Sequence, residues 1–112
     1  MSNSVATDVQ PMVAIIILNW NGLQDTIECL QSLRASTYRN VRIWVLDNGS
    51  REDPSLALAN FPEITLLRSA ENLGFAGGNN YAAEIALAEQ PDYILLLNND
   101  TIVPPEMISE LV

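Results

Sequence analysis

The chain has 112 residues with 14 acidic and 5 basic side chains, so its formal net charge is −9. This length predicts one domain with a substantial core, and the acidic balance disfavours nucleic acid and anionic membranes as partners. The sequence contains no histidine and no lysine. A histidine-based triad, a histidine metal ligand, a P-loop lysine and a lysine Schiff base are therefore excluded.

The N-terminal residues do not resemble a targeting segment. Residues 1–11 are polar, with neither a basic start nor an apolar core, so we expect a disordered leader rather than a signal peptide. No stretch approaches the roughly 20 apolar residues of a membrane span. Cys29 is the single cysteine and cannot form an internal disulfide, which favours a reducing, cytoplasmic compartment. We expect its side chain to be buried on a helix.

The first part of the chain alternates strand and helix. Residues 12–18 are dense in β-branched side chains and predict a strand. Apolar side chains then recur at helical spacing, which predicts a helix over residues 25–35, and Asp25 and Glu28 have the spacing of a capping box. Residues 41–46 predict a second strand. The Asn-Gly turn that follows this strand tolerates a positive φ.

The alternation continues to the last residues. A short helix is expected from Pro54 to about residue 59, and a third strand over residues 64–67. Residues 72–80 predict a glycine-rich loop, followed by an alanine-rich helix over residues 81–89. The apolar run at residues 93–97 predicts a strand that is buried on both faces. A last helix begins at the two prolines 104 and 105.

This order of elements predicts an α/β fold. Alternating strands and helices form a parallel sheet with right-handed crossovers, and helices cover both faces. We therefore expect a Rossmann-like arrangement of three layers, helix, sheet and helix. The last helix has no following strand, so the sequence reads as the first half of a larger domain or as a cut chain.

Polar clusters follow three of the predicted strands: Asn19-Trp20-Asn21, Asp47-Asn48 and Asn98-Asn99-Asp100. Because the carboxyl ends of parallel strands meet at one edge of a sheet, we expect these clusters to share a rim where a ligand binds. The dinucleotide motif is absent, because the first turn holds one glycine. Gly74, Gly77 and Gly78 let the backbone approach a ligand or form a plain turn, and the sequence leaves both open.

The rim residues suggest how a nucleotide would be held. Asp100 offers a hard oxygen ligand for Mg²⁺ or Mn²⁺, with a bound diphosphate supplying further oxygens. Asn98 and Asn99 can hydrogen-bond ribose hydroxyls or diphosphate. The alternative is that this segment only caps a turn before Pro104.

The other two clusters also allow a structural role. Asp47 can accept hydrogen bonds from a base N–H or a ribose hydroxyl, or can simply form the turn before Asn-Gly. Asn19 and Asn21 can contact the base or cap the first helix. Trp20 can stack on a base or cover the strand end.

Four segments together resemble the family-two glycosyltransferases of GT-A fold: residues 15–22, 45–50, 71–80 and 96–101. They occur in the family's order and together extend over nearly all of the chain from residue 13 onward. Residues 12–112 would be the N-terminal, nucleotide-sugar-binding part of such a domain. The third and fourth segments look most like the rhamnosyltransferase-like branch, which builds bacterial cell-surface polysaccharide.

The resemblance implies a function and roles for individual residues. Asp47 matches the acid that contacts the nucleobase, Asp100 occupies the metal position of the Asp-x-Asp region, and Asn98 and Asn99 lie where ribose and diphosphate are contacted. Asn98 departs from the acidic form of that motif. The implied reaction transfers a sugar, with inversion, from a UDP- or dTDP-sugar to a saccharide or lipid-linked acceptor with Mg²⁺ or Mn²⁺. The family's catalytic base has no match here, so we expect no catalytic residue in this chain and little transfer by it alone.

Two other classes of protein are open alternatives. A non-catalytic module of this fold would bind a nucleotide or another protein, and its exposed sheet edge or apolar surface would favour a homo-oligomer. A nucleotidyltransferase of the sugar-nucleotide pyrophosphorylase type shares a related architecture, but it normally has a basic glycine-rich loop after the first strand. A position of the full-length protein at the inner face of the membrane is also left open.

Overall fold

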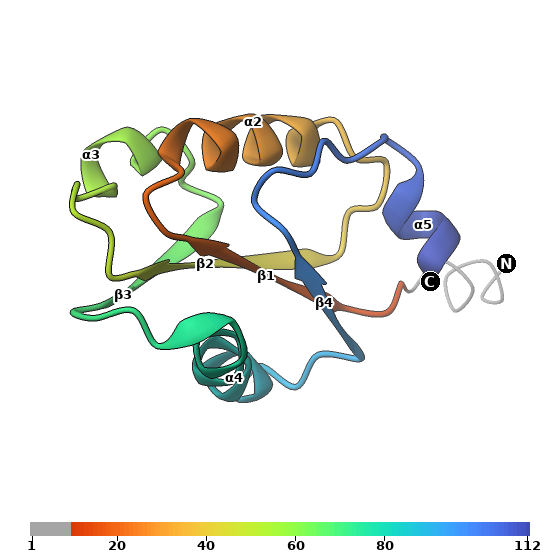
Figure 1. Ribbon diagram of the computed structural model, residues 1–112. Helices are drawn as coiled ribbons and strands as arrows, with labels where there is room; N and C mark the ends of the chain where they lie inside the picture. The colour runs from red at the N-terminus through yellow and green to blue at the C-terminus, as the bar shows by residue number, and fades with distance from the viewer. Residues whose placement is uncertain (1–9) are drawn as a thin grey trace, which may run out of the picture.

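The computed structural model describes residues 10–112, so nearly all of the expected leader lies outside the described residues. Strands and helices alternate from the first element to the last (Figure 1). In chain order they are β1 (Val13–Asn19), α2 (Leu23–Arg34), β2 (Val41–Asn48), α3 (Ser55–Leu58), β3 (Ile64–Ser69), α4 (Gly74–Leu87), β4 (Tyr93–Leu97) and α5 (Met107–Leu111). None of the helices within this described range is long and apolar enough to cross a membrane.

The four strands form one parallel sheet in the order β3-β2-β1-β4. Helices α2, α3 and α5 lie on one face and α4 lies on the other (Figure 1). The predicted three-layer α/β architecture is therefore confirmed. Strand β1 is central, and its register pairs Asn19 with Asp47 of β2, which brings two of the predicted polar clusters side by side.

The apolar run of β1 supplies both hydrophobic cores. Successive side chains of a strand point to opposite faces. Accordingly, Ile15 and Ile17 pack with α2 in the larger core, whereas Ala14 and Ile16 pack with Ala82 and Ala86 of α4. Because helices cover both faces, this strand has no polar residue before Asn19 and is apolar throughout. Cys29 belongs to the larger core, as predicted.

Strand β4 does not have the burial that its apolar sequence predicts. Ile94 and Leu96 are 38% and 50% exposed, and only Leu97 is fully buried. The prediction that this strand is buried on both faces is therefore wrong. The reason is its place at the sheet edge, where it pairs only with β1 and lies beside, rather than beneath, α4.

The glycine-rich segment is mostly helical rather than a loop. Helix α4 begins at Gly74, seven residues before the predicted start at Tyr81. The Asn48 side chain fixes this start: its Oδ1 accepts the Leu73 N–H at 2.8 Å and its Nδ2 donates to the Gly74 carbonyl at 3.1 Å. Propensity alone disfavours glycine in a helix, so a tertiary contact has overridden it here.

The predicted capping box is also absent. Helix α2 begins at Leu23 with Gly22 as its N-cap, and no side chain caps it. Asp25 consequently lies within the first turn instead of preceding the helix. There its charge is favourable with respect to the helix dipole.

Two neighbouring glycines of α4 give opposite predictions for substitution by alanine. A Cβ at Gly78 would lie 3.0 Å from Asn48 Nδ2 and 3.2 Å from a Leu18 methyl, whereas a Cβ at Gly77 would meet only Leu73 Cβ at 3.4 Å. We expect Gly77→Ala to stabilise the protein by about 0.5–1 kcal/mol through helix propensity. Gly78→Ala should destabilise it by about 1–3 kcal/mol through overpacking. Urea denaturation measures both, and equal effects would contradict the close packing at Gly78.

Candidate functional site

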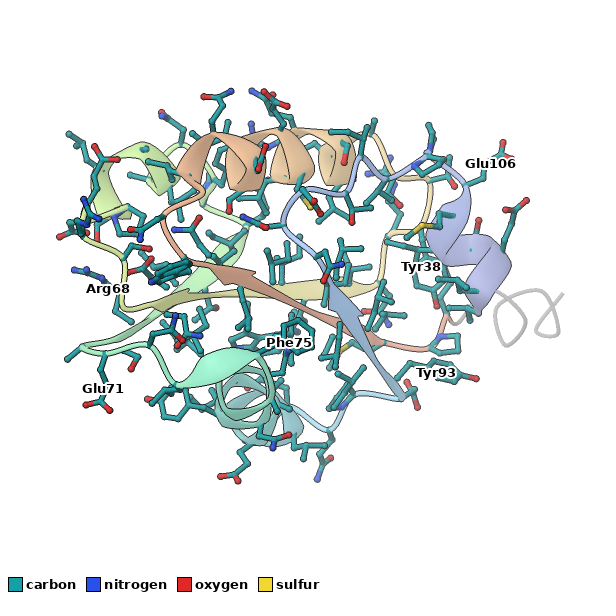
Figure 2. The ribbon with its side chains drawn as sticks, in the orientation of Figure 1. Tyr38, Arg68, Glu71, Phe75, Tyr93 and Glu106 are labelled. Atoms are coloured by element: carbon teal, nitrogen blue, oxygen red, sulfur yellow. The ribbon has the colours of Figure 1, made fainter. Side chains whose placement is uncertain are left out.

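The carboxyl-terminal ends of the strands form one rim that carries most of the predicted site residues. Asn19 ends β1, Asp47 lies near the end of β2, and Asn98 follows the last residue of β4 directly. Figure 2 shows Arg68 of β3 at this end of the sheet, with Tyr38 and Tyr93 at the opposite end. Parallel pairing thus brings residues from four separate segments together.

Asp47 is completely buried beneath this rim. Its Oδ1 accepts a hydrogen bond from Asn19 Nδ2 at 3.0 Å, and its Oδ2 lies 3.4 Å from both Nε and Nη2 of Arg68. Arg68 is partly exposed and also pairs with the surface residue Asp53 at 3.2 Å. The Asp47 carboxylate is therefore directed into the protein, where a buried charge requires such partners.

A buried threonine extends this network to the end of β4. Thr26 of α2 donates from its hydroxyl to Asn19 Oδ1 at 2.7 Å and accepts from Asn99 Nδ2 at 3.1 Å. Asn99 Nδ2 also donates to the Gly22 carbonyl at 3.2 Å. One chain of hydrogen bonds thus runs from Asp47 of β2 through Asn19 of β1 and Thr26 of α2 to Asn99, which follows β4.

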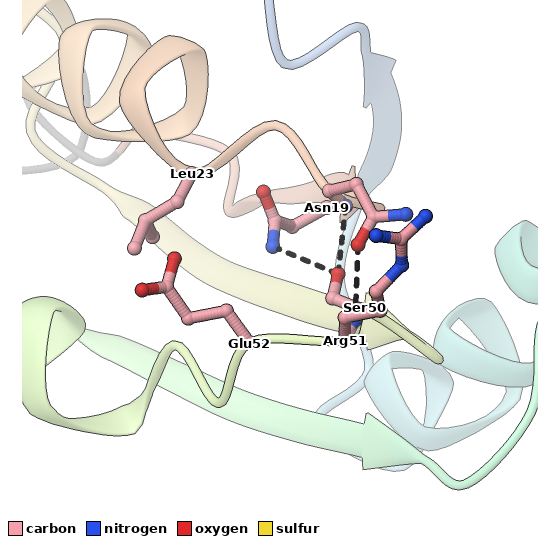
Figure 3. A pocket seen from close by; sticks show the side chains of 6 residues that line it. Asn19, Leu23, Ser50, Arg51 and Glu52 are labelled. Atoms are coloured by element: carbon pink, nitrogen blue, oxygen red, sulfur yellow. Dashed lines mark hydrogen bonds between the residues drawn. The ribbon is translucent and has the colours of Figure 1, made fainter.

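A first depression opens on one side of this network (Figure 3). Its volume is about 300 Å³, and it is lined by Asn19, Asn21, Leu23, Ser50, Arg51 and Glu52. The Ser50 hydroxyl organises its wall, because Oγ accepts the Asn21 backbone N–H at 2.8 Å and lies 3.4 Å from Asn19 Nδ2. Asn21 adopts a positive φ of 51° and accepts the Arg51 N–H at 2.9 Å.

Trp20 lies beside these residues and is 55% exposed. An exposed indole at a rim is available for stacking on a planar ligand. Its alternative predicted role, covering the strand end, would bury more of the ring.

A second depression of about 230 Å³ lies on the other side of the network. Its lining combines the predicted polar cluster with apolar side chains: Leu18, Phe75, Asn79, Leu96, Leu97, Asn98, Asn99 and Asp100. Asn98 and Asp100 are exposed and Asn99 is half-buried.

Burial, together with the nearby Asp100 charge, raises the pKa of the Cys29 thiol to about 11, so this cysteine stays protonated at neutral pH.

The second depression fits a cation that a ligand helps to hold. Within residues 10–112, no group of three or more acidic, cysteine or histidine side chains could bind a metal ion unaided. Asp100 contributes one exposed carboxylate, and Asn98 and Asn99 contribute amides beside it. Mg²⁺ and Mn²⁺ accept hard oxygen ligands of this kind and commonly take the remainder from a bound phosphate.

Sequence reasoning missed three residues that build the site: Thr26, Ser50 and Arg68. A signal for Thr26 exists, because it is the polar member of the helical stripe formed by the buried residues 26, 30 and 33 of α2. Arg68 is the basic residue one position before the end of β3. Its pairing with Asp47 depends on the register of β2 against β3, which pairs these two residues directly.

Comparisons with known proteins identify the family of the chain. The model of the family described as glycosyl transferase family 2 matches residues 14–112. This chain belongs to glycosyl transferase family 2. Among relatives of this family, an uncharacterized glycosyltransferase of Rickettsia typhi is 29% identical over 98 residues, which cover 88% of this chain and 30% of that protein. The glycosyltransferase GlyG of Streptococcus pneumoniae is 24% identical over 104 residues, which cover 89% of this chain and 34% of that protein.

Solved glycosyltransferase structures share the fold. The mannosyltransferase PcManGT of Pyrobaculum calidifontis, in complex with GDP-Man and Mn²⁺, superposes with a TM-score of 0.76 at 21% identity over 87% of this chain and 30% of that one. TarS of Staphylococcus aureus, in complex with UDP-GlcNAc, superposes with a TM-score of 0.74 at 16% identity, over 89% of this chain and 30% of that one. The chain has the GT-A type of α/β fold and spans about a third of the length of the curated relatives it matches.

Proposed function

We propose that this chain is the donor-binding part of an inverting glycosyltransferase that uses a UDP- or dTDP-sugar. The carrying observation is the rim, where two depressions flank one hydrogen-bonded network and the second one contains Asp100. Family membership and neighbours solved with GDP-Man and UDP-GlcNAc support a nucleotide-sugar donor.

The nucleoside would occupy the first depression. Asn21, Ser50 and Arg51 offer donors and acceptors there, and Trp20 offers an aromatic face. Asp47 would contribute mainly by holding Asn19 and Arg68 in place, since its carboxylate is fully buried and already bonded. The family resemblance suggests a direct contact between Asp47 and a nucleobase. For that contact, the Asp47 carboxylate would have to give up its hydrogen bond with Asn19 or its ion pair with Arg68.

The diphosphate would lie over the second depression. Asp100 would hold a divalent cation there, and Asn98 would contact ribose or diphosphate oxygens. Asn99, whose Nδ2 already donates to Thr26 and Gly22, would offer its amide oxygen to a ribose hydroxyl or to the cation. When bound, the cation supplies positive charge that stabilises the departing diphosphate. Phe75 and Leu96 line the same depression with apolar side chains.

The finer parts of the proposal follow from the resemblance. The acceptor would be a saccharide or a lipid-linked molecule. The enzyme would belong to the rhamnosyltransferase-like branch and act in bacterial cell-surface polysaccharide synthesis in the cytoplasm. The acceptor site and the catalytic base would be supplied by residues outside this chain.

Calorimetric titration with UDP, dTDP and GDP, with and without Mn²⁺, tests the donor site. We expect Mn²⁺-dependent binding of UDP or dTDP that Asp100→Asn weakens about tenfold or more, because the substitution removes the carboxylate charge that holds the cation. Glu110→Gln is the matched control. It removes the same charge from an exposed position on α5 and should leave binding unchanged. Binding that ignores both Mn²⁺ and Asp100→Asn would contradict the proposed site.

A second candidate function is a protein-interaction module. The supporting observation is strand β4, whose outer edge is unpaired within the described sheet and whose Ile94 and Leu96 are partly exposed. Unpaired edges with apolar side chains favour association. Light scattering across a concentration series tests this reading, and a stable homo-oligomer with no nucleotide affinity would favour it over the donor site.

A further inference from the structure

We propose that Thr26 is a positioning residue that turns the Asn99 amide so that its oxygen, and not its nitrogen, faces the second depression beside Asp100. The rim would then offer two oxygens, one neutral and one charged, to a divalent cation. The cation part of this inference rests on the proposed function. The orientation of the amide does not.

The orientation begins at the buried carboxylate of Asp47, which can only accept hydrogen bonds. Asn19 must therefore present its Nδ2 to Asp47, at 3.0 Å, which leaves its Oδ1 facing the hydroxyl of Thr26 at 2.7 Å. The single hydroxyl proton of Thr26 is consequently donated to Asn19. The Gly22 carbonyl, the other acceptor near this hydroxyl, lies farther away at 3.2 Å. Thr26 Oγ1 then has only its two lone pairs left, so any further group that approaches it has to be a donor.

Asn99 is the group that approaches. Its Nδ2 lies 3.1 Å from Thr26 Oγ1 and 3.2 Å from the Gly22 carbonyl, which is also an acceptor only. Because two hydrogen-bond acceptors face this side of the Asn99 amide, its nitrogen and not its oxygen must lie there. The contact is close-packed as well, since a Cβ at Gly22 would lie 2.9 Å from Asn99 Nδ2.

The Asn99 oxygen is thereby left for solvent or a ligand. It accepts no hydrogen bond from another residue in the described range, and no buried side-chain polar atom there lacks a partner, so this oxygen is not completely buried. Asn99 and Asp100 both line the second depression. An amide oxygen and a carboxylate together suit Mg²⁺ or Mn²⁺, whereas an outward amide nitrogen would suit a phosphate oxygen directly.

The test uses Thr26→Val, which keeps the shape of the side chain without the hydroxyl, and Thr26→Ser, which keeps the hydroxyl. The first readout is hydrogen exchange of the Asn99 side-chain amide in ¹⁵N-labelled protein without ligand. We expect slow exchange in the native chain and in Thr26→Ser, and exchange about tenfold faster in Thr26→Val. Because the Gly22 carbonyl still accepts from Asn99 Nδ2 in this variant, unchanged exchange in Thr26→Val would overturn the role of Thr26 in holding the amide, whatever the nucleotide results.

The second readout is the ratio of UDP affinities measured with and without Mn²⁺. Thr26→Val should lower this ratio about fivefold, whereas Thr26→Ser, which keeps the hydroxyl, should leave the ratio unchanged. General loss of structure would instead lower the affinities with and without Mn²⁺ alike. In an Asn99→Ala background, Thr26→Val should have no further effect on the ratio, because the two residues act through one contact. An additive effect would overturn the role in cation binding. Absence of any UDP binding by the native chain would overturn that role together with the proposed function, while the exchange result would still decide whether Thr26 holds the Asn99 amide.

Discussion

Replacing Asp47 with alanine is expected to lower the free energy of unfolding by about 3 kcal/mol, because removing one partner from a buried charged network leaves the others uncompensated. Asp47 is fully buried and accepts from Asn19 and Arg68. Its loss would leave the buried Asn19 Nδ2 with only the long 3.4 Å contact to Ser50. Urea denaturation followed by the fluorescence of Trp44, which is buried between β2 and α4, measures the change.

Asp53→Ala is the matched control for this prediction. Asp53 pairs with the same arginine, at 3.2 Å, but lies at the surface, where ion pairs contribute little. Its Oδ1 also accepts the Ser55 N–H at 2.9 Å and the Ser55 hydroxyl at 2.6 Å at the start of α3, so we expect its removal to lower the free energy of unfolding by only about 1 kcal/mol. Similar losses for the two aspartates would mean that charge near Arg68, rather than burial, stabilises the rim.

The second large effect is expected at Gly49, where alanine should cost about 3 kcal/mol through backbone strain and collision with the neighbouring loop. Gly49 has a φ of +80°, and a Cβ there would lie 2.6 Å from the backbone of both Glu71 and Asn72. Backbone atoms cannot rotate away as a flexible side chain can. Relief would require moving the segment that leads into α4, which Asn48 holds through Leu73. Thermal and urea denaturation measure the loss.

Gly74 offers a control with the same backbone conformation. Its φ is also +80°, but nothing lies within 4 Å of the Cβ position. Gly74→Ala should therefore lower the free energy of unfolding only through the left-handed backbone conformation, by about 1–2 kcal/mol. The difference between the two variants isolates the steric contribution at Gly49, and equal costs would show that the loop moves freely.

The local sequence pattern predicted a strand or turn correctly where an apolar run or a turn-forming residue pair was the dominant feature. The strand at residues 93–97 was predicted with the bounds that β4 has, and the Asn-Gly turn with its positive φ at Gly49 is confirmed. Errors arose where a distant residue overrides local preference. Helix α4 includes most of a glycine-rich segment because Asn48, 25 residues before Leu73, binds the start of the helix. No propensity calculation contains that contact.

The candidate site shows the same division. Asn19, Asn21, Asp47 and Asn98 to Asp100 were predicted to share a rim, and the parallel register places them there. Their individual ligand contacts remain predictions. What the sequence did not indicate is which of these side chains face inward. Asp47 and Asn19 are buried and Asn98 and Asp100 are exposed, because the end of β2 lies inside the sheet and β4 lies at its edge.

The sequence by itself determined the order of elements, the parallel sheet and the end of the sheet at which polar groups gather, because apolar runs, turn residues and strand direction are local properties. Only the tertiary structure decided the exposure of β4, the helical start at Gly74 and the bonds of Thr26 with Asn19 and Asn99. These features depend on which segments lie next to each other after folding. Hydrogen-bond direction in a buried network is likewise decided by all of its members together.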